Sequence, residues 1–178
     1  MSRPRHWYPS EAHPRLRPKE WFHGTSTIVA DALEHGKSLA LQRVFRDANV
    51  SLGGSYLTFE YPLAKIYAEN AAGALGGDPV VLVVKEQFPL FPDEDLAAKL
   101  TDYRVPETKD RRLRALVDAL FADPNYYDGV SLSDLYRDRY DELNKELGIT
   151  WKDSLKYTHS VRQKQPLRVS QIVGHISL

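Results

Sequence analysis

The chain contains no cysteine among its 178 residues. Disulfide bonds, thiolate catalysis and sulfur-ligated zinc are therefore excluded together. The six histidines are scattered along the chain and form neither an HExxH nor an HxxxH pair. We therefore expect no metal site, because metal-binding histidines usually recur at such short spacings.

Long apolar runs are also missing, since the longest extends only from Pro79 to Val84. Such a run is far too short to cross a membrane, and the arginine-rich N-terminal stretch lacks the apolar segment of a secretory signal. We expect a cytoplasmic protein with no membrane partner; export by a machine that needs no cleavable signal stays open.

Charge of one sign is not in excess, because 24 Lys and Arg residues face 24 Asp and Glu residues. The net charge therefore gives no argument for nucleic acid, and any such partner must be held by a local patch. The run Lys109 to Arg114 is basic, but a charged run of this kind is usually a solvated helix face.

The length suits one hydrophobic core, so we expect a single domain over residues 20–178. Residues 1–19 hold four prolines and five basic side chains, a composition that resists packing into helix or sheet. We expect a flexible arm there. Its alternative role is docking or contact with nucleic acid through Trp7 and Tyr8.

The apolar pattern predicts alternating strands and helices. Val80 to Val84 predicts a fully buried central strand, which is the strongest of these signals. Residues 37–55 predict a loop over the mouth of a pocket. A strand is expected over 21–25, followed by a helix that Ser26 or Thr27 caps, that has Ile28, Ala32 and Leu33 near one face and that ends at Gly36. A second strand at Tyr56 precedes a helix over 62–72 with Leu63, Ile66 and Tyr67 inward. The remaining expected elements are helices over 93–122 and 131–147 and strands at about 157–166 and 171–178.

Three short segments carry the chemistry: His23-Gly24-Thr25, Ser55-Tyr56-Leu57-Thr58, and a helix with Tyr67 eleven residues after Tyr56. A glycine backbone can approach a ligand amide closely. An imidazole can donate from one nitrogen to a sugar hydroxyl while the other nitrogen is anchored to the backbone. Two tyrosine rings offer flat faces with polar tips. Together these groups predict a nicotinamide pocket.

These segments resemble the ADP-ribosyltransferase superfamily, in the branch with a His-Tyr-Glu signature that includes diphtheria toxin and the poly(ADP-ribose) polymerases. The likeness covers about residues 20–85 and, more loosely, the last twenty. It implies an α+β fold of two facing, mostly antiparallel β-sheets around an NAD cleft, with flanking helices and a helical insertion over 93–156. It also implies that NAD is the co-substrate, bound by His23, Gly24, Thr25, Tyr56, Ala64 and Tyr67.

The third motif of that family carries a glutamate, but no glutamate follows Glu146 here. Alignment of the closing strands places Ser160 at that position, with Gln163 and Gln165 as neighbouring alternatives. The resemblance therefore implies His23, Tyr56, Ser160 and Gln163 as catalytic residues of a mono-ADP-ribosyltransferase, a toxin or effector acting on a protein or nucleic acid acceptor, with a neutralising partner protein as a candidate companion. The alternatives are a catalytically silent domain that binds NAD or ADP-ribose, and an RNA 2′-phosphotransferase-like enzyme.

Overall fold

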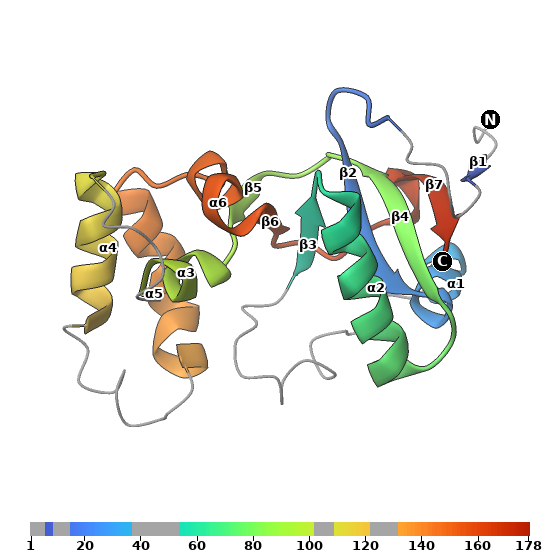
Figure 1. The fold of residues 1–178 in the computed structure, drawn as a ribbon, viewed down its shortest axis with the longest axis horizontal. Helices are drawn as coiled ribbons and strands as arrows, with labels where there is room; N and C mark the ends of the chain where they lie inside the picture. Colours follow the sequence, from blue (N-terminus) through green and yellow to red (C-terminus); the bar gives the residue numbers. More distant parts are fainter. Residues whose placement is uncertain (1–5, 9–14, 37–53, 102–108, 122–131) are drawn as a thin grey trace. The chain divides into compact units, whose positions relative to one another are not determined.

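The computed structural model describes residues 6–8, 15–36, 54–101, 109–121 and 132–178, and its fold is α+β (Figure 1). The chain divides into two compact units. The first comprises Met1–Val44, Gly54–Pro89 and Gln163–Leu178, and the second comprises Phe45–Gly53 and Leu90–Arg162. The loop predicted over residues 37–55 lies outside the described residues up to residue 53. The predicted single domain, the facing pair of sheets and the ADP-ribosyltransferase-like fold stay predictions.

The first unit is built on a β-sheet with the strand order β1-β7-β4-β2-β3. The strands are β1 (His6–Tyr8), β2 (Glu20–Ser26), β3 (Ser55–Thr58), β4 (Pro79–Lys85) and β7 (Ile172–Ser177). Strand β4 lies in the middle and pairs antiparallel with both β2 and β7, so the prediction of a buried central strand is confirmed. The expectation that residues 1–19 resist sheet formation is wrong at His6–Tyr8, because β1 pairs in parallel with β7.

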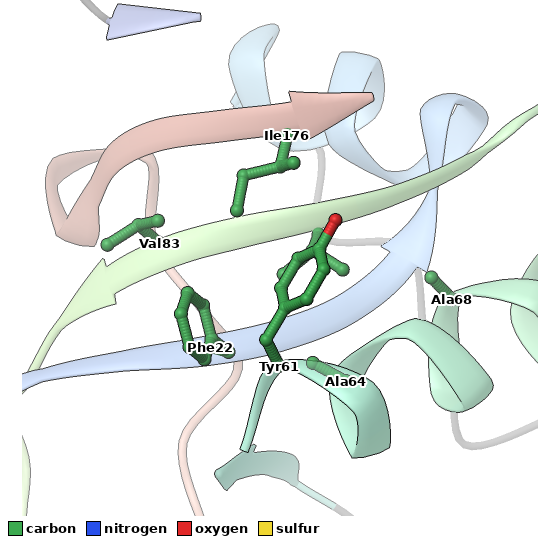
Figure 2. Close-up of a cluster of buried hydrophobic side chains, with 7 residues drawn as sticks. Phe22, Tyr61, Ala64, Ala68, Val83 and Ile176 are labelled. Carbon is green, nitrogen blue, oxygen red and sulfur yellow. The ribbon is translucent and has the colours of Figure 1, made fainter. Parts of the chain in front are cut away.

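Helix α2 (Tyr61–Leu75) packs against β2 and β4 and covers one face of the sheet. Figure 2 shows Phe22 of β2, Tyr61 and two alanines of α2, and Ile176 of β7 meeting in this core. The prediction that Ile66 faces inward is wrong, since the residue is 52% exposed, and Leu63 and Tyr67 are only half-buried. The inner stripe of α2 consists instead of Tyr61, Ala64, Ala68 and Ala71, because small side chains let the helix axis approach the strands closely.

Helix α1 (Thr27–Glu34) follows β2 directly and buries Val29, Ala30 and Leu33. Ile28, which was expected on the apolar face, is 46% exposed. Ser26 occupies the N-cap position without a side-chain capping hydrogen bond. The helix ends at Glu34, and Gly36 follows with φ +70°, as the sequence predicted for its end. A short 3₁₀ turn, η3 (Val169–Gln171), precedes β7.

The second unit is mainly helical. It contains β5 (Leu90–Pro92), α3 (Asp95–Thr101), α4 (Arg111–Phe121), α5 (Leu132–Glu146), α6 (Trp151–Thr158) and β6 (Ser160–Gln163), whose last residue belongs to the first unit. Leu96, Leu113, Leu116, Tyr140 and Ile149 form its core. The helix predicted over 93–122 is confirmed only in part: α3 and α4 lie within it, but the described residues 93–94 and 109–110 are not helical. The helix predicted over 131–147 is confirmed as α5. Residues 102–108 and 122–131 lie outside the described residues.

Helix α6 was missed by the sequence analysis, which placed a strand from about residue 157. The helix continues to Thr158, and the strand begins only at Ser160. Its start is set by a local polar contact, in which the Thr150 N–H donates to Asp153 Oδ2 at 2.8 Å. Among the helices of the described residues, none has the length and apolar character needed to cross a membrane.

Candidate functional site

The His23 side chain joins β2 to β3. Its Nδ1 lies 2.8 Å from the backbone oxygen of Tyr56, although the residues are 33 positions apart. The ring is buried, with 8% of the residue exposed. Burial lowers the pKa of His23 below its usual value, against a smaller opposing effect of the bond to Tyr56. The imidazole is therefore neutral at neutral pH.

The partner of His23 decides which nitrogen carries the proton. A carbonyl oxygen can only accept, so Nδ1 must be the donor to Tyr56. In a neutral imidazole, Nε2 then carries a lone pair and accepts hydrogen bonds. From the sequence we expected the free nitrogen to donate to a sugar hydroxyl. The geometry reverses that role: Nε2 can accept the proton of a hydroxyl.

The main chain of Gly24 points towards β3. Beyond the two ends of the β2–β4 pairing, Thr27 N donates to Asp78 O and Glu86 N donates to Lys19 O, both at 2.8 Å. Because hydrogen-bonded positions alternate along an antiparallel pair, the odd-numbered residues of β2 bond to β4 and the even-numbered ones face the other neighbour. Gly24 therefore directs its N–H and C=O towards β3.

The pairing of β2 with β3 is at Phe22 and Thr58. Continuation of this register would put Tyr56 opposite Gly24, and it is the Tyr56 carbonyl that accepts from His23. The imidazole thus donates to the Tyr56 carbonyl that, in a continuous β-ladder, would accept from the Gly24 N–H. The His23 side chain and the Gly24 main chain therefore lie together between β2 and β3.

The absence of a side chain at Gly24 is required by helix α2. A Cβ atom built there would lie 1.9 Å from the Ala64 oxygen, 2.6 Å from the Ala68 nitrogen and 2.9 Å from Cβ of Tyr67. The close packing brings Cβ of Tyr67 next to Gly24. Ala64 is fully buried and contributes its small size to this contact. The first two predicted segments and Tyr67 therefore meet in one region, with Thr25 buried beside them on β2.

Gln163 lies next to the second segment but is occupied by structural contacts. Its backbone oxygen would be only 2.2 Å from a Cβ at Gly54, which precedes β3. Its buried side-chain amide donates to Gln165 O at 2.8 Å, and Gln171 Nε2 donates to Gln163 Oε1 at 2.9 Å. Gln171 also donates to Lys85 O at 3.2 Å. This amide pair ties β6 to the turn before β7, and a catalytic role of Gln163 stays a prediction.

Ser160 belongs to the second unit and is fully buried there. Its hydroxyl donates to Asp93 Oδ2, and its backbone oxygen accepts from Ser154 Oγ at 3.1 Å and Thr158 Oγ1 at 3.0 Å. These contacts link β6 to α6 and to the start of α3. A buried serine in such a network is held in place by its neighbours, and its assignment to the third motif stays a prediction.

Asp93 is the centre of that network and was not singled out from the sequence. Its backbone N–H donates to Ser154 Oγ at 2.9 Å, and the Tyr140 hydroxyl donates to its backbone carbonyl at 2.7 Å. Burial, with Asp95 nearby, raises the pKa of Asp93 to about 6, while the bond from Ser160 and the charge of Arg162 oppose this rise. Only the sequence Pro-Asp-Glu-Asp after β5 hinted at a cluster of carboxylates.

Arg162 is the buried cation of the same unit. Its Nη2 lies 2.5 Å from Asp141 Oδ1, and its Nε lies 3.9 Å from Glu94 Oε2. Only 3% of the arginine side chain is exposed. Within the part of the chain that the structure describes, no three His, Cys, Asp or Glu side chains gather where a metal ion could bind.

Comparison of the chain with models of protein families, with curated proteins and with solved structures finds no match.

Proposed function

We propose that this protein is an NAD-dependent mono-ADP-ribosyltransferase, a toxin or effector that modifies a macromolecular acceptor and releases nicotinamide. One observation carries the proposal: His23 closes onto the Tyr56 carbonyl while the main chain of Gly24 faces the same strand. This arrangement puts a hydrogen-bond acceptor and a peptide group side by side, and Cβ of Tyr67 lies next to Gly24.

Each group has a definite role in holding the dinucleotide. The N–H and C=O of Gly24 bind the carboxamide of nicotinamide, which has one acceptor and one donor group to match. His23 Nε2 accepts a hydroxyl proton of the adjoining ribose. The rings of Tyr56 and Tyr67 cover the faces of the nicotinamide and exclude water from it.

The reaction is a displacement at the anomeric carbon of that ribose. The bond between this carbon and the nicotinamide nitrogen breaks, and its electron pair neutralises the pyridinium. A nucleophilic atom of the acceptor forms the new bond and loses its proton to a base. The protein contributes mainly by positioning, because ribose and leaving group are held by separate hydrogen bonds.

The position of the third-motif glutamate has no negative charge in this chain, which limits the rate of ADP-ribose transfer. Ser160 and Gln163 are neutral, so neither stabilises positive charge on the ribose as a carboxylate would. We therefore expect slow transfer of one ADP-ribose without chain elongation. A carboxylate, phosphate or nucleobase of the acceptor supplies the missing base.

The test is incubation of the full chain with labelled NAD and cell lysate, followed by separate nuclease and protease digestion of the labelled product. We expect label on a macromolecule and stoichiometric release of nicotinamide. His23→Ala should lower NAD affinity by at least about tenfold, because it removes one hydrogen bond to the ligand and the hydrogen bond to Tyr56 of β3. The matched control is His35→Ala directly after α1, where an exposed imidazole also contacts a backbone oxygen, that of Asp31, at 2.7 Å. Equal NAD affinities of the two variants would sink the proposal.

A second candidate is a domain that binds NAD or ADP-ribose without turnover. The engagement of the Gln163 amide by Gln165 and Gln171 favours it, because this side chain has its hydrogen bonds already filled. Calorimetry separates the two candidates: saturable heat with NAD, abolished by His23→Ala, together with no transfer of label, would establish the binding domain.

A further inference from the structure

Five exposed basic side chains lie in the second unit, at the start of α4 and along α6: Lys109, Arg111, Arg114, Lys152 and, in the last turn of α6, Lys156. We call them the α4–α6 basic surface. The starts of the two helices, both visible in Figure 1, are joined by Arg112, which donates to Asp153 Oδ1 at 3.0 Å and to Gly148 O at 2.7 Å. The five cations therefore belong to one region of the unit.

Acidic side chains within this region are already committed. Asp110 is the only acid in residues 109–117, and Asp153 is the only acid in residues 151–160. Both carboxylates pair with Arg112, at 2.7 Å for Asp110 and 3.0 Å for Asp153. Exposed Asp118 follows Arg114 by one turn of α4. Even with Asp118 included, three carboxylates cannot balance Arg112 and five further cations, so the surface stays positive although the chain as a whole is neutral.

The placement of the cations on α4 is unfavourable for the helix itself. The first turn of α4 has no acidic residue, and Arg111 and Arg114 stand within it. Positive charges near a helix N-terminus oppose the helix dipole at a cost of about 0.3–1 kcal/mol each. The carboxylate directly before the helix, Asp110, accepts from Arg112 N at 2.9 Å and pairs with the Arg112 guanidinium. An anionic partner would offset the cost of placing Arg111 and Arg114 there.

Two of the cations accompany aromatic rings on α6. Lys152 Nζ lies 5.6 Å from the centre of the Trp151 ring, and Lys156 Nζ lies 5.2 Å from that of Tyr157. Both tyrosine and tryptophan are half-buried, so part of each ring reaches the surface. Alternation of cations with flat rings is typical of surfaces that follow single-stranded nucleic acid, where the cations bind phosphates and the rings stack on bases.

We propose that the α4–α6 basic surface binds single-stranded nucleic acid, and that nucleic acid is the acceptor of the transferred ADP-ribose. The second part rests on the function proposed above, whereas the binding itself does not. An acidic protein would satisfy the cations but gives no reason for the accompanying rings. The neutral net charge confines the contact to this surface.

The binding test titrates a fluorescently labelled single-stranded DNA and RNA with the full chain at increasing salt, without NAD. Five phosphate contacts at about 0.7 counterions each predict a slope of about −3.5 for log affinity against log salt. Affinity should therefore fall roughly a hundredfold between about 50 and 200 mM salt. No binding, or a slope near zero, overturns the proposal, as does tighter binding of poly-glutamate than of either strand.

Two independent variants keep the test valid if one of them fails to fold. Replacement of Lys109, Arg111 and Arg114 by Gln should reduce the slope to about −1.4, and Lys152→Gln with Lys156→Gln should reduce it to about −2.1. Lys65→Gln, on α2 of the first unit with a 50% exposed side chain, is the control and should leave the slope unchanged. Equal slopes for the control and both variants overturn the proposal.

Failure of this inference can be told from failure of the proposed function. Calorimetry with NAD on the Lys152→Gln, Lys156→Gln variant should give the wild-type affinity, because these residues are not part of the dinucleotide site. DNA or RNA binding without any NAD binding refutes the proposed function but supports the α4–α6 basic surface as a nucleic-acid-binding site. Transfer of label that resists nuclease and is lost with protease overturns nucleic acid as the acceptor.

Discussion

Substitution of Gly24 by alanine tests the contact on which the candidate site is built. The new Cβ would be 1.9 Å from the Ala64 oxygen and 2.6 Å from the Ala68 nitrogen, and both are main-chain atoms of α2. Contacts of a Cβ essentially never fall below 3.0 Å, so relief of the first one requires a displacement of about 1.1 Å. A side-chain rotation cannot provide it, and α2 must move away from β2.

The cost follows from the core that α2 covers. Overpacking of this kind typically costs about 1–3 kcal/mol. Gly→Ala in a strand returns roughly 0.5–1 kcal/mol through the lower entropy of the unfolded chain. We therefore expect a net loss of about 1–2 kcal/mol, which lowers Tm by about 2–8 °C for a chain of this size. NAD affinity should fall as well, because the backbone of Tyr67 moves with the helix.

The assay is differential scanning calorimetry with and without NAD, and the matched control is Gly73→Ala. Gly73 lies on the same helix, and a Cβ there meets nothing within 4 Å. This control should raise stability by up to about 1 kcal/mol, as alanine does for glycine within a helix. A Gly24→Ala protein as stable as the Gly73→Ala protein would show that α2 does not press on β2, and the reasoning about the site would fail with it.

Three further predictions concern buried polar groups. The pKa of Asp93 is raised from 3.8 to about 6, so between these pH values the folded state keeps a proton that the unfolded state releases. The free energy of unfolding should therefore fall by about 3 kcal/mol at most as pH rises across that window. Asp93→Asn should flatten this pH dependence, and a variant with the wild-type pH profile in thermal unfolding would contradict the burial argument. Arg162→Met leaves Asp141 without its buried cation and should cost about 3–5 kcal/mol in urea unfolding, whereas the exposed Arg112→Met should cost little; equal losses would be inconsistent with the difference in burial. Gln171→Ala removes the partner of the Gln163 amide and should cost about 1–3 kcal/mol, measured by urea unfolding, and an unaffected midpoint would mean that the pair is not formed in solution.

Local patterns in the sequence predicted several elements of the first unit. The run Val80 to Val84 indicates a buried strand by composition alone, and β4 is that strand. Gly36 ends α1, since glycine readily adopts the positive φ found there. The order and spacing of His23, Gly24, Tyr56 and Tyr67 predicted one shared region, and the His23–Tyr56 bond and the Gly24–Tyr67 packing lie together there. Binding of NAD at this place stays a proposal.

Element boundaries and faces were less predictable where long-range packing decides them. Hydrophobicity favoured Ile66 as an inward residue of α2, but the close approach of the helix to Gly24 selects the alanine stripe instead. Residues 157–158 have strand-like composition, yet they complete α6, and Thr158 is held by Ser154 and Ser160. Such contacts depend on how the folded backbone brings residues together, and the local periodicity of apolar residues does not reveal them.

The sequence alone determined that the chain has no thiol chemistry and no net charge. It also determined the order and spacing of His23, Gly24, Tyr56 and Tyr67, which predict a nicotinamide pocket. Only the tertiary structure decided which nitrogen of His23 carries the proton, where the Gly24 peptide points and why Asp93 holds its proton to about pH 6. Composition and spacing are properties of the chain itself. Hydrogen-bond direction, strand register and desolvation depend on which distant residues the fold brings together, and they exist only once it has formed.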